Sequence, residues 1–306
     1  MSTTRNDLAL SFPAPLPPAM PPAGAESMLA AAMQGFQVLR RRWQCLGPAC
    51  LGRERRRAWR PARIGLQDGW CCGPECFQAA VETRVTAELH GQAAPRRRRS
   101  HRVPLGLLLL SRGTIDHGQL KRALEMQTSY GGGRIGEWLM RDRAIDQEDI
   151  AAGVGLQWAR PTFRLAQSQS WRLCRGWVPL SILETQRLLP LHFAPARRKL
   201  YVGFTQNVDP TALAALARIF ECKTESCIVT DAALDGALEQ LRALPAYDHV
   251  QDIGFDHLDD PAEIAGIVRQ YAQFIEARQT RVETVGPFLW VRLRGQKIVH
   301  LTFKGK

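Results

Sequence analysis

The chain has 306 residues, 45% of them hydrophobic, and a formal net charge of +12. At about 100–200 residues per domain, this length predicts two or three folded modules, and the apolar content is sufficient for packed cores. No apolar run approaches the roughly 20 residues that span a bilayer. We therefore expect a cytoplasmic protein without membrane insertion.

The N-terminal segment, 1–38, is rich in proline and alanine, as in "FPAPLPPAMPPAGA". Prolines interrupt the apolar residues of its first part, 1–27, which therefore lacks the continuous apolar region of a signal peptide. Its composition is typical of an extended, disordered tail that buries little surface. Folded structure is expected to begin after this tail.

Five of the eight cysteines lie in two short motifs, "CLGPACLG" and "GWCCGPECF". In a chain without secretory features, such clustering favours metal binding over disulfide formation. Four thiolates, two from a Gly-Pro turn and two from the start of a helix, suit tetrahedral zinc. The predicted ligands are Cys45, Cys50, Cys72 and Cys76, with Cys71 as the rival for the third position. The second motif looks like the second half of treble-clef zinc modules, in which an aromatic residue precedes the third ligand.

A basic block surrounds these cysteines. Residues 36–104 contain 15 arginines and five acidic residues, a local balance of +10. We assign residues 39–95 to the zinc module and residues 96–101, with four consecutive arginines, to a basic linker. Such a block can bind nucleic acid, an anionic lipid surface or an acidic protein. Aromatic residues between the arginines keep nucleic-acid binding through residues 40–102 as an alternative function; they are Trp43, Trp59 and Trp70.

One sequence plan occurs twice, at 104–127 ("PLGLLLLSRGTIDHGQLKRALEMQ") and at 134–157 ("RIGEWLMRDRAIDQEDIAAGVGLQ"). In each copy a glycine opens an apolar run at helical spacing, and Ile-Asp precedes a second run, where Asp is a typical N-cap. Each copy is therefore predicted to be a helical hairpin, and two hairpins in tandem can bury their faces against each other. On periodicity alone, the repeat could be no more than a small helical bundle.

If the copies pack as a pair, Gly106 and Gly136 are expected at equivalent places at the starts of equivalent helices. The intervening "TSYGGG" is expected to be an exposed connector, because three glycines cost too much backbone entropy inside a helix or strand. The shared core is expected to join two sets of apolar side chains: Leu109, Leu120 and Leu124 with Leu139, Ile150 and Val154.

The rest of the chain predicts a mixture of strands and helices. "LLPLHFAPARRKLYVGF" alternates around a basic turn, as a β-hairpin does, and Asp209-Pro210 begins a helix. "ESCIVT" predicts a strand, followed by a helix capped by Thr230 or Asp231. Residues 250–306 predict one helix and then two or three strands. The fold class is therefore α+β, built from several modules.

The repeat and the segments after it resemble the N-terminal domain of type II secretion and type IV pilus assembly ATPases, including the members that bind cyclic di-GMP. Residues 102–245 resemble that domain, with the helical repeat at 104–157 and an αβ part at 168–245, and residues 250–306 resemble the start of the second N-terminal module. The sequence contains no Gly-x-x-x-x-Gly-Lys-Ser/Thr to cradle ATP phosphates. We therefore expect the motor domain to be absent and the protein not to be an enzyme.

The resemblance also implies residues that bind cyclic di-GMP: Leu105, Gly106, Gln127, Arg134, Ile135, Gly136 and Gln157. In the family an arginine of each copy stacks on guanine or pairs with phosphate, as a planar guanidinium can. Here Pro104 replaces the arginine of the first copy, although Arg102 could reach the ligand instead, and Arg143 replaces the second glycine of the second copy. Losing one charge-assisted contact costs about 1.5–3 kcal/mol.

These features together predict a non-catalytic regulatory or adaptor protein. By resemblance, its partner is a protein of a secretion or pilus system, because the family's N-terminal region docks the ATPase onto cytoplasmic parts of the membrane assembly. With one ligand arginine missing, cyclic di-GMP is expected to bind weakly or not at all.

Overall fold

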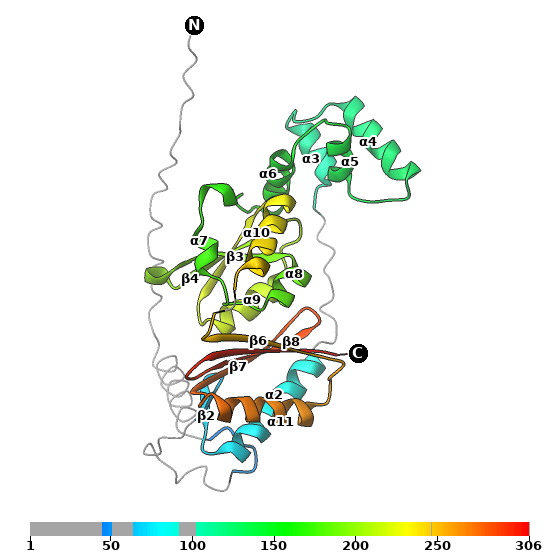
Figure 1. The fold of residues 1–306 in the computed structure, drawn as a ribbon. Coiled ribbons are helices and arrows are strands. Elements are labelled where there is room, and N and C mark those ends of the chain that lie inside the picture. The colour runs from blue at the N-terminus through cyan, green and yellow to red at the C-terminus, as the bar shows by residue number, and fades with distance from the viewer. Residues whose placement is uncertain (1–44, 51–63, 92–101, 246, 306) are drawn as a thin grey trace, which may run out of the picture. The chain divides into compact units, whose positions relative to one another are not determined.

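The computed structural model describes residues 45–50, 64–91, 102–245 and 247–305 (Figure 1). Over these residues the fold is α+β, as the sequence predicts, with ten α-helices and with strands arranged in a six-stranded and a three-stranded sheet. The expected tail, 1–38, and the expected basic linker, 96–101, lie outside the described residues.

The repeat folds into four helices: α3 (Leu105–Ser111), α4 (His117–Ser129), α5 (Ile135–Arg141) and α6 (Gln147–Trp158). Asp116 and Asp146 are the N-caps of α4 and α6, and each closes a capping box with the residue three positions later. The side chain of the cap accepts from a backbone N–H that has no partner within the helix, which explains why the second helix of each copy begins there. Each copy is therefore a helical hairpin, as predicted.

The connector between the copies is shorter than "TSYGGG", because α4 continues to Ser129. The three glycines that follow have positive φ, at 80°, 119° and 89° for Gly131, Gly132 and Gly133. This left-handed backbone favours residues without a Cβ. The connector is mostly exposed, as expected.

The αβ part contains a three-stranded sheet in the order β3-β4-β5, in which β4 pairs antiparallel with β3 and parallel with β5. Asp209 and Thr230 cap its two longer helices, as predicted. Its elements are the 3₁₀ turn η1 (Leu165–Gln167), α7 (Ser170–Leu173), α8 (Leu180–Gln186), β3 (Leu188–Ala194), the 3₁₀ turn η2 (Pro195–Arg197), β4 (Lys199–Phe204), α9 (Pro210–Ile219), β5 (Lys223–Ile228) and α10 (Asp231–Ala243).

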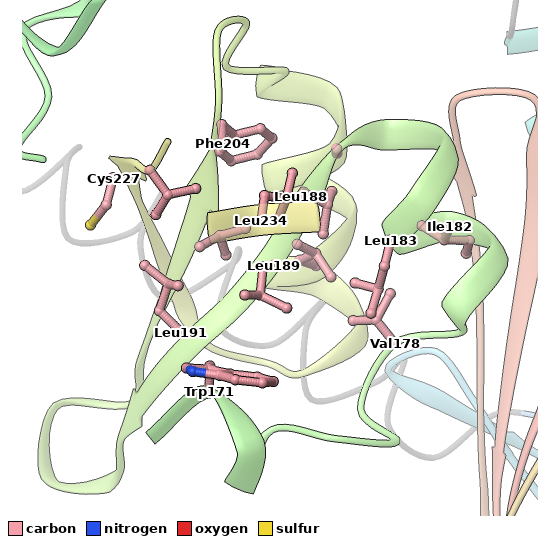
Figure 2. Packing of buried hydrophobic residues seen from close by; sticks show 14 of the residues in the cluster. Trp171, Val178, Ile182, Leu183, Leu188, Leu189, Leu191, Phe204, Cys227 and Leu234 are labelled. Atoms are coloured by element: carbon pink, nitrogen blue, oxygen red, sulfur yellow. The ribbon is translucent and has the colours of Figure 1, made fainter. Parts of the chain in front are cut away.

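The core of the αβ part is centred on β3, which is apolar on both faces and contributes Leu188, Leu189 and Leu191 (Figure 2). A strand that is buried on both faces reads as a continuous apolar run, as "LLPL" does. Two residues of α6 in the repeat, Ala151 and Val154, belong to the same core. Helix α6 therefore joins the repeat to the αβ part.

The C-terminal segment forms most of the six-stranded sheet, whose order is β2-β1-β7-β8-β9-β6. Strands β7, β8 and β9 form the expected antiparallel run, and β6, which the sequence did not indicate, pairs parallel with β9. The elements are β6 (Val250–Asp256), α11 (Pro261–Phe274), β7 (Gln279–Val285), β8 (Phe288–Arg294) and β9 (Ile298–Lys304).

The cysteine-rich segment completes this sheet. Its short hairpin, β1 (Ile64–Leu66) and β2 (Gly69–Cys71), pairs through β1 with the edge of β7, and its helix α2 (Pro74–Gly91) lies beside α11 (Figure 1). Both helices and the sheet share one hydrophobic cluster. The sequence predicts 39–95 and 250–306 as separate segments, whereas their described parts form one folded unit. A hairpin of two such short strands is too small to be stable alone, so the long-range pairing explains its order.

Candidate functional site

The first candidate site is a cluster of four cysteines. The Sγ atoms of Cys45, Cys50, Cys72 and Cys76 all lie within 4.8 Å of one another. Two of the distances, Cys50 to Cys72 and Cys72 to Cys76, are 3.6 Å. A tetrahedral Zn–S bond of about 2.3 Å places ligand sulfurs about 3.8 Å apart. The donor set and its spacing therefore fit a four-coordinate thiolate metal site, and they are the four ligands predicted from the sequence.

Backbone N–H groups surround this cluster. Gly47 and Cys72 both donate to the Sγ atom of Cys45, at 3.4 and 3.3 Å. Such contacts stabilise a thiolate and orient it for the metal. A Cβ on Gly47 would lie 2.7 Å from the Cβ atom of Cys76, so the turn can approach the helix only because this residue is glycine.

Cys71 is placed differently from Cys72. Its side chain is completely buried in the cluster that α2 and α11 share, and it is not one of the four grouped sulfurs. Burial raises the pKa of the Cys71 thiol to about 12, so the thiol stays protonated. Cys72 follows β2, while Cys76 lies in the first turn of α2, where the helix dipole favours a thiolate. The spacing of Cys45 to Cys50 in the sequence recurs at Cys71 to Cys76, so spacing alone does not choose between the two neighbours. The grouping of the Cys72 sulfur with the other three favours Cys72.

The second candidate site is the repeat, whose copies 104–127 and 134–157 correspond position by position. Gly106 and Gly136 are both buried and both stand second in their helices, as predicted. A Cβ on Gly106 would lie 2.7 Å from the Cδ1 atom of Leu120, and a Cβ on Gly136 would lie 3.1 Å from the Cδ1 atom of Ile150. Leu120 and Ile150 also stand at equivalent positions of the two copies. The same close approach of two helices therefore occurs in both.

The last predicted ligand of each copy makes an equivalent hydrogen bond. The Nε2 atom of Gln127 donates to the carbonyl oxygen of Gly133 at 2.6 Å, and that of Gln157 donates to the carbonyl oxygen of Val103 at 2.7 Å. Both acceptors directly precede the N-cap of a first helix. Each copy therefore holds the entry to the first helix of the other copy, which is the pattern of a pseudo-two-fold pair.

The turn inside each hairpin is also equivalent. Gly113 and Arg143 occupy the same position and both have positive φ, 69° and 53°. In each copy the next backbone N–H, of Thr114 or Ala144, donates to the carbonyl oxygen of the equivalent leucine, Leu109 or Leu139, at 3.0 Å. Arg143 therefore keeps the turn of the glycine that it replaces, at the cost of a left-handed backbone.

Arg134 and Pro104 are the N-caps of α5 and α3, with the same ψ of 138°. Arg134 is exposed, and among the described residues its guanidinium has neither a hydrogen bond nor an ion pair. Arg102 is not free in this way, because its guanidinium stacks on the ring of Trp158. The conformation of the first copy therefore places residue 104, and not Arg102, at the position equivalent to Arg134.

The apolar residues of the repeat do not all lie in one core. Leu109, Leu120 and Leu139 are buried together, with Ile150 packed against them, as expected. Two other expectations are wrong. Leu124 is 46% exposed, and Val154 is buried in the core of the αβ part. Both residues lie on the outward face of a second helix, and only the second copy has a neighbour there among the described residues.

The structure also contains buried polar contacts that the sequence did not indicate. His300 on β9 accepts from Trp290 Nε1 through its Nδ1 atom at 3.1 Å, and its Nε2 atom lies 3.0 Å from the carbonyl oxygen of Gly176. Glu283 on β7 is ion-paired with Arg218 at 2.7 Å, while burial raises the pKa of the carboxyl. Polar residues that alternate along a strand are typical of an exposed face, so the sequence carries no signal for these contacts.

No family model matches this sequence, and neither does any curated protein. Among solved structures, the fold is similar to that of MshE with cdg (c-di-GMP), at 20% identity and a TM-score of 0.39, over 46% of this chain and 99% of that one. It is also similar to the N-terminal domain of XpsE in two crystal forms, at 17% and 19% identity and TM-scores of 0.32 and 0.26. Those two matches cover 45% and 43% of this chain, and 92% and 89% of the XpsE chains. At these identities and scores, no residue role is transferred from these proteins.

Within the described ranges, no helix combines the length and the hydrophobicity that a membrane crossing requires.

Proposed function

We propose that this chain is a non-catalytic regulatory or adaptor protein of the cytoplasm, related to the N-terminal domain of secretion and pilus ATPases. It binds a protein partner of such a system, and its repeat binds cyclic di-GMP weakly. The observation that carries the proposal is the pairing of equivalent glycines and glutamines in the two copies, at Gly106 and Gly136 and at Gln127 and Gln157.

Weak binding follows from how much of a two-fold ligand site the repeat retains. A dinucleotide with two equivalent halves is matched by a protein surface with two equivalent halves. Arg134 supplies an exposed guanidinium in one half, while Pro104 supplies no charge in the other. Since one charge-assisted contact contributes about 1.5–3 kcal/mol, a site with only one arginine should bind in the micromolar range.

We propose Zn(II) as the metal of the cysteine cluster, within a module of treble-clef type. Four thiolates without a vacant position favour a structural site over a catalytic one. Cys45 and Cys50 would hold the metal from the turn, and Cys72 and Cys76 from the hairpin and α2. The bound metal would tie the N-terminal side of the hairpin to the helix that packs on the six-stranded sheet.

Titration calorimetry of cyclic di-GMP against the full chain tests the nucleotide part of the proposal. We expect micromolar binding that Arg134→Ala abolishes and that Arg141→Ala leaves unchanged. Arg141 is the matched control, because it is an exposed arginine of the same copy that is not a predicted ligand. Submicromolar affinity that Arg134→Ala does not alter would contradict the proposal. Affinity capture with the purified chain tests the partner, which should be a secretion or pilus component.

The second candidate function is nucleic-acid binding, and the observation in its favour is the local balance of +10 over residues 36–104. Much of this block lies outside the described residues. Binding driven by phosphate contacts falls steeply as salt rises. Retention on a heparin column that is lost over a narrow salt range, with no effect of Arg134→Ala, would favour this function over the first.

A further inference from the structure

Helix α4 exposes a groove that no other described part of the chain covers. The groove has a volume of about 550 Å³, and the described residues that line it all belong to α4: His117, Leu120, Lys121, Leu124, Glu125, Thr128 and Ser129. Leu124 lies within this set and is 46% exposed. A large aliphatic side chain left half exposed on an ordered helix loses the free energy that burial would supply.

In the pseudo-symmetry of the repeat, the α4 face that contains Leu124 is equivalent to a face of α6. Laying the first copy over the second maps Lys121 and Leu124 of α4 onto Ala151 and Val154 of α6. The α6 residues are both 4% exposed, because this face packs on the core of the αβ part. The equivalent face of α4 has the position and orientation of a packing surface, but no described element fills it.

The charges on the α4 face differ from those on the α6 face. Where α6 has Ala151 and Gly155, α4 has Lys121 and Glu125, which are ion-paired with each other at 3.9 Å and whose side chains are 79% and 62% exposed. A lysine and a glutamate on either side of Leu124 form a surface that is complementary to itself when it is turned around. A face of this kind fits a second copy of the same helix in antiparallel orientation.

We propose that α4 is a homodimer interface, in which the α4 helices of two copies of this chain pack antiparallel around a two-fold axis. With Lys121 level with Glu125 of the second copy, both ion pairs of the two-fold form at once. A helix rises about 1.5 Å per residue, so Leu124 is then only about 3 Å along the axis from Leu124 of the second copy, and also about 3 Å from its Leu120. Each half-exposed leucine is therefore buried against the other. This proposal does not rest on the proposed function.

Sedimentation equilibrium of the full chain, from the micromolar to the hundred-micromolar range, tests the interface. We expect a monomer–dimer equilibrium whose dissociation constant rises at least about tenfold in Leu124→Glu. Lys121→Glu and Glu125→Lys should each weaken the dimer by about tenfold, because each places like charges opposite one another. The double variant, with both changes, should restore the wild-type dissociation constant.

The control is Leu173→Glu, since Leu173 on α7 is 80% exposed and lies outside the groove. This variant should dimerise like the wild type, and circular dichroism should show that every variant is folded. Three results would each overturn the proposal: a monomer over the whole range, a dimer unaffected by Leu124→Glu, or a double variant weaker than either single one.

Discussion

The side-chain amide of Gln157 donates to the backbone carbonyl oxygen of Val103, 2.7 Å away, and so fastens the end of the repeat to its beginning. Gln127 makes the equivalent bond to Gly133. The two copies thus hold each other's first helices at the N-cap, and the repeat is a closed pair and not an open row of hairpins.

Truncating equivalent core residues of the two copies should lower the free energy of unfolding by similar amounts. Leu109 and Leu139 occupy the same place in the two copies and are 2% and 0% exposed. Truncation of either to alanine should lower the free energy of unfolding by about 2–5 kcal/mol, because each leaves a cavity in the same small core. Leu107→Ala should cost under about 0.5 kcal/mol, since Leu107 is 51% exposed. Urea denaturation of the three variants is the measurement, and a cost for Leu109→Ala or Leu139→Ala as small as that of Leu107→Ala would contradict the pairing.

Removing the glycine from one hairpin turn should lower the free energy of unfolding, and introducing a glycine into the other turn should raise it. Gly113 has a φ of 69° and open space around it, so Gly113→Ala should cost about 1 kcal/mol for backbone strain alone. Arg143 has a φ of 53°, and Arg143→Gly should raise the free energy of unfolding by roughly 0.5–1 kcal/mol by removing that strain. Thermal or urea unfolding measures both changes. A destabilising Arg143→Gly would show that the two turns are not equivalent.

Substitutions of the adjacent residues Cys71 and Cys72 should have different effects on the zinc content of the protein. Cys72→Ser should abolish stoichiometric zinc, because it removes one of four thiolates, whereas Cys71→Ser should keep the metal and lose stability only through its buried position. Metal analysis of freshly purified protein measures the difference. Loss of zinc in Cys71→Ser but not in Cys72→Ser would reverse the assignment of the third ligand.

Metal affinity should also depend on pH. Burial raises the pKa of the thiols of Cys72 and Cys76, so without metal both are protonated at neutral pH and must release protons to bind zinc. The affinity should therefore rise with pH and fall on acidification. Competition with a chromophoric chelator at several pH values measures this slope, and a flat profile would contradict thiolate coordination. Removal of zinc should affect the six-stranded sheet too, since the cysteine-rich segment shares its core.

His300 should make the protein sensitive to mild acid. Burial lowers the pKa of its imidazole to about 3, with Arg292 adding to the effect, whereas an unfolded histidine has a pKa of about 6.5. Between these values the unfolded chain takes up a proton that the folded chain does not. Stability is therefore lost as the pH falls below about 6.5, by about 2 kcal/mol at pH 5.

The measurement is the free energy of unfolding at pH 7 and pH 5 for the wild type and for His300→Gln. The variant should be less stable at pH 7, because it loses the contacts of the imidazole to Trp290 and Gly176. The pH-dependent loss should nevertheless be about 2 kcal/mol smaller than in the wild type. Equal losses in the two proteins would show that His300 does not titrate as a buried neutral group.

Local signals in the sequence predicted local structure well. The caps Asp116 and Asp146 follow from short spacings along the chain, and both are confirmed. The four cysteines predicted as metal ligands do lie close together, although spacing alone left Cys71 as a rival of Cys72. Periodicity could not decide which core a helix face joins, and it therefore placed Leu124 and Val154 wrongly. That choice depends on whether another element lies beside the helix, and for Val154 this element comes from the αβ part.

Long-range pairings were beyond the sequence. Strand β6 reads "VQDIGFD", whose Gly and Asp residues are uncommon in strands. It forms because it pairs with β9, which lies much later in the chain. Gly65 on β1 likewise pairs with Gln279 on β7. No spacing rule connects residues this far apart, so the joining of the cysteine-rich segment to the C-terminal sheet could be found only in three dimensions.

The most direct test of the proposed cyclic di-GMP site in the repeat is the affinity of Pro104→Arg for this nucleotide, measured by titration calorimetry beside the wild type. Residue 104 and Arg134 cap equivalent helices with the same ψ, so the new guanidinium should complete the second half of the site. We predict that binding tightens at least tenfold, about 1.4 kcal/mol. An affinity unchanged by Pro104→Arg, in a protein that remains folded, would contradict the account.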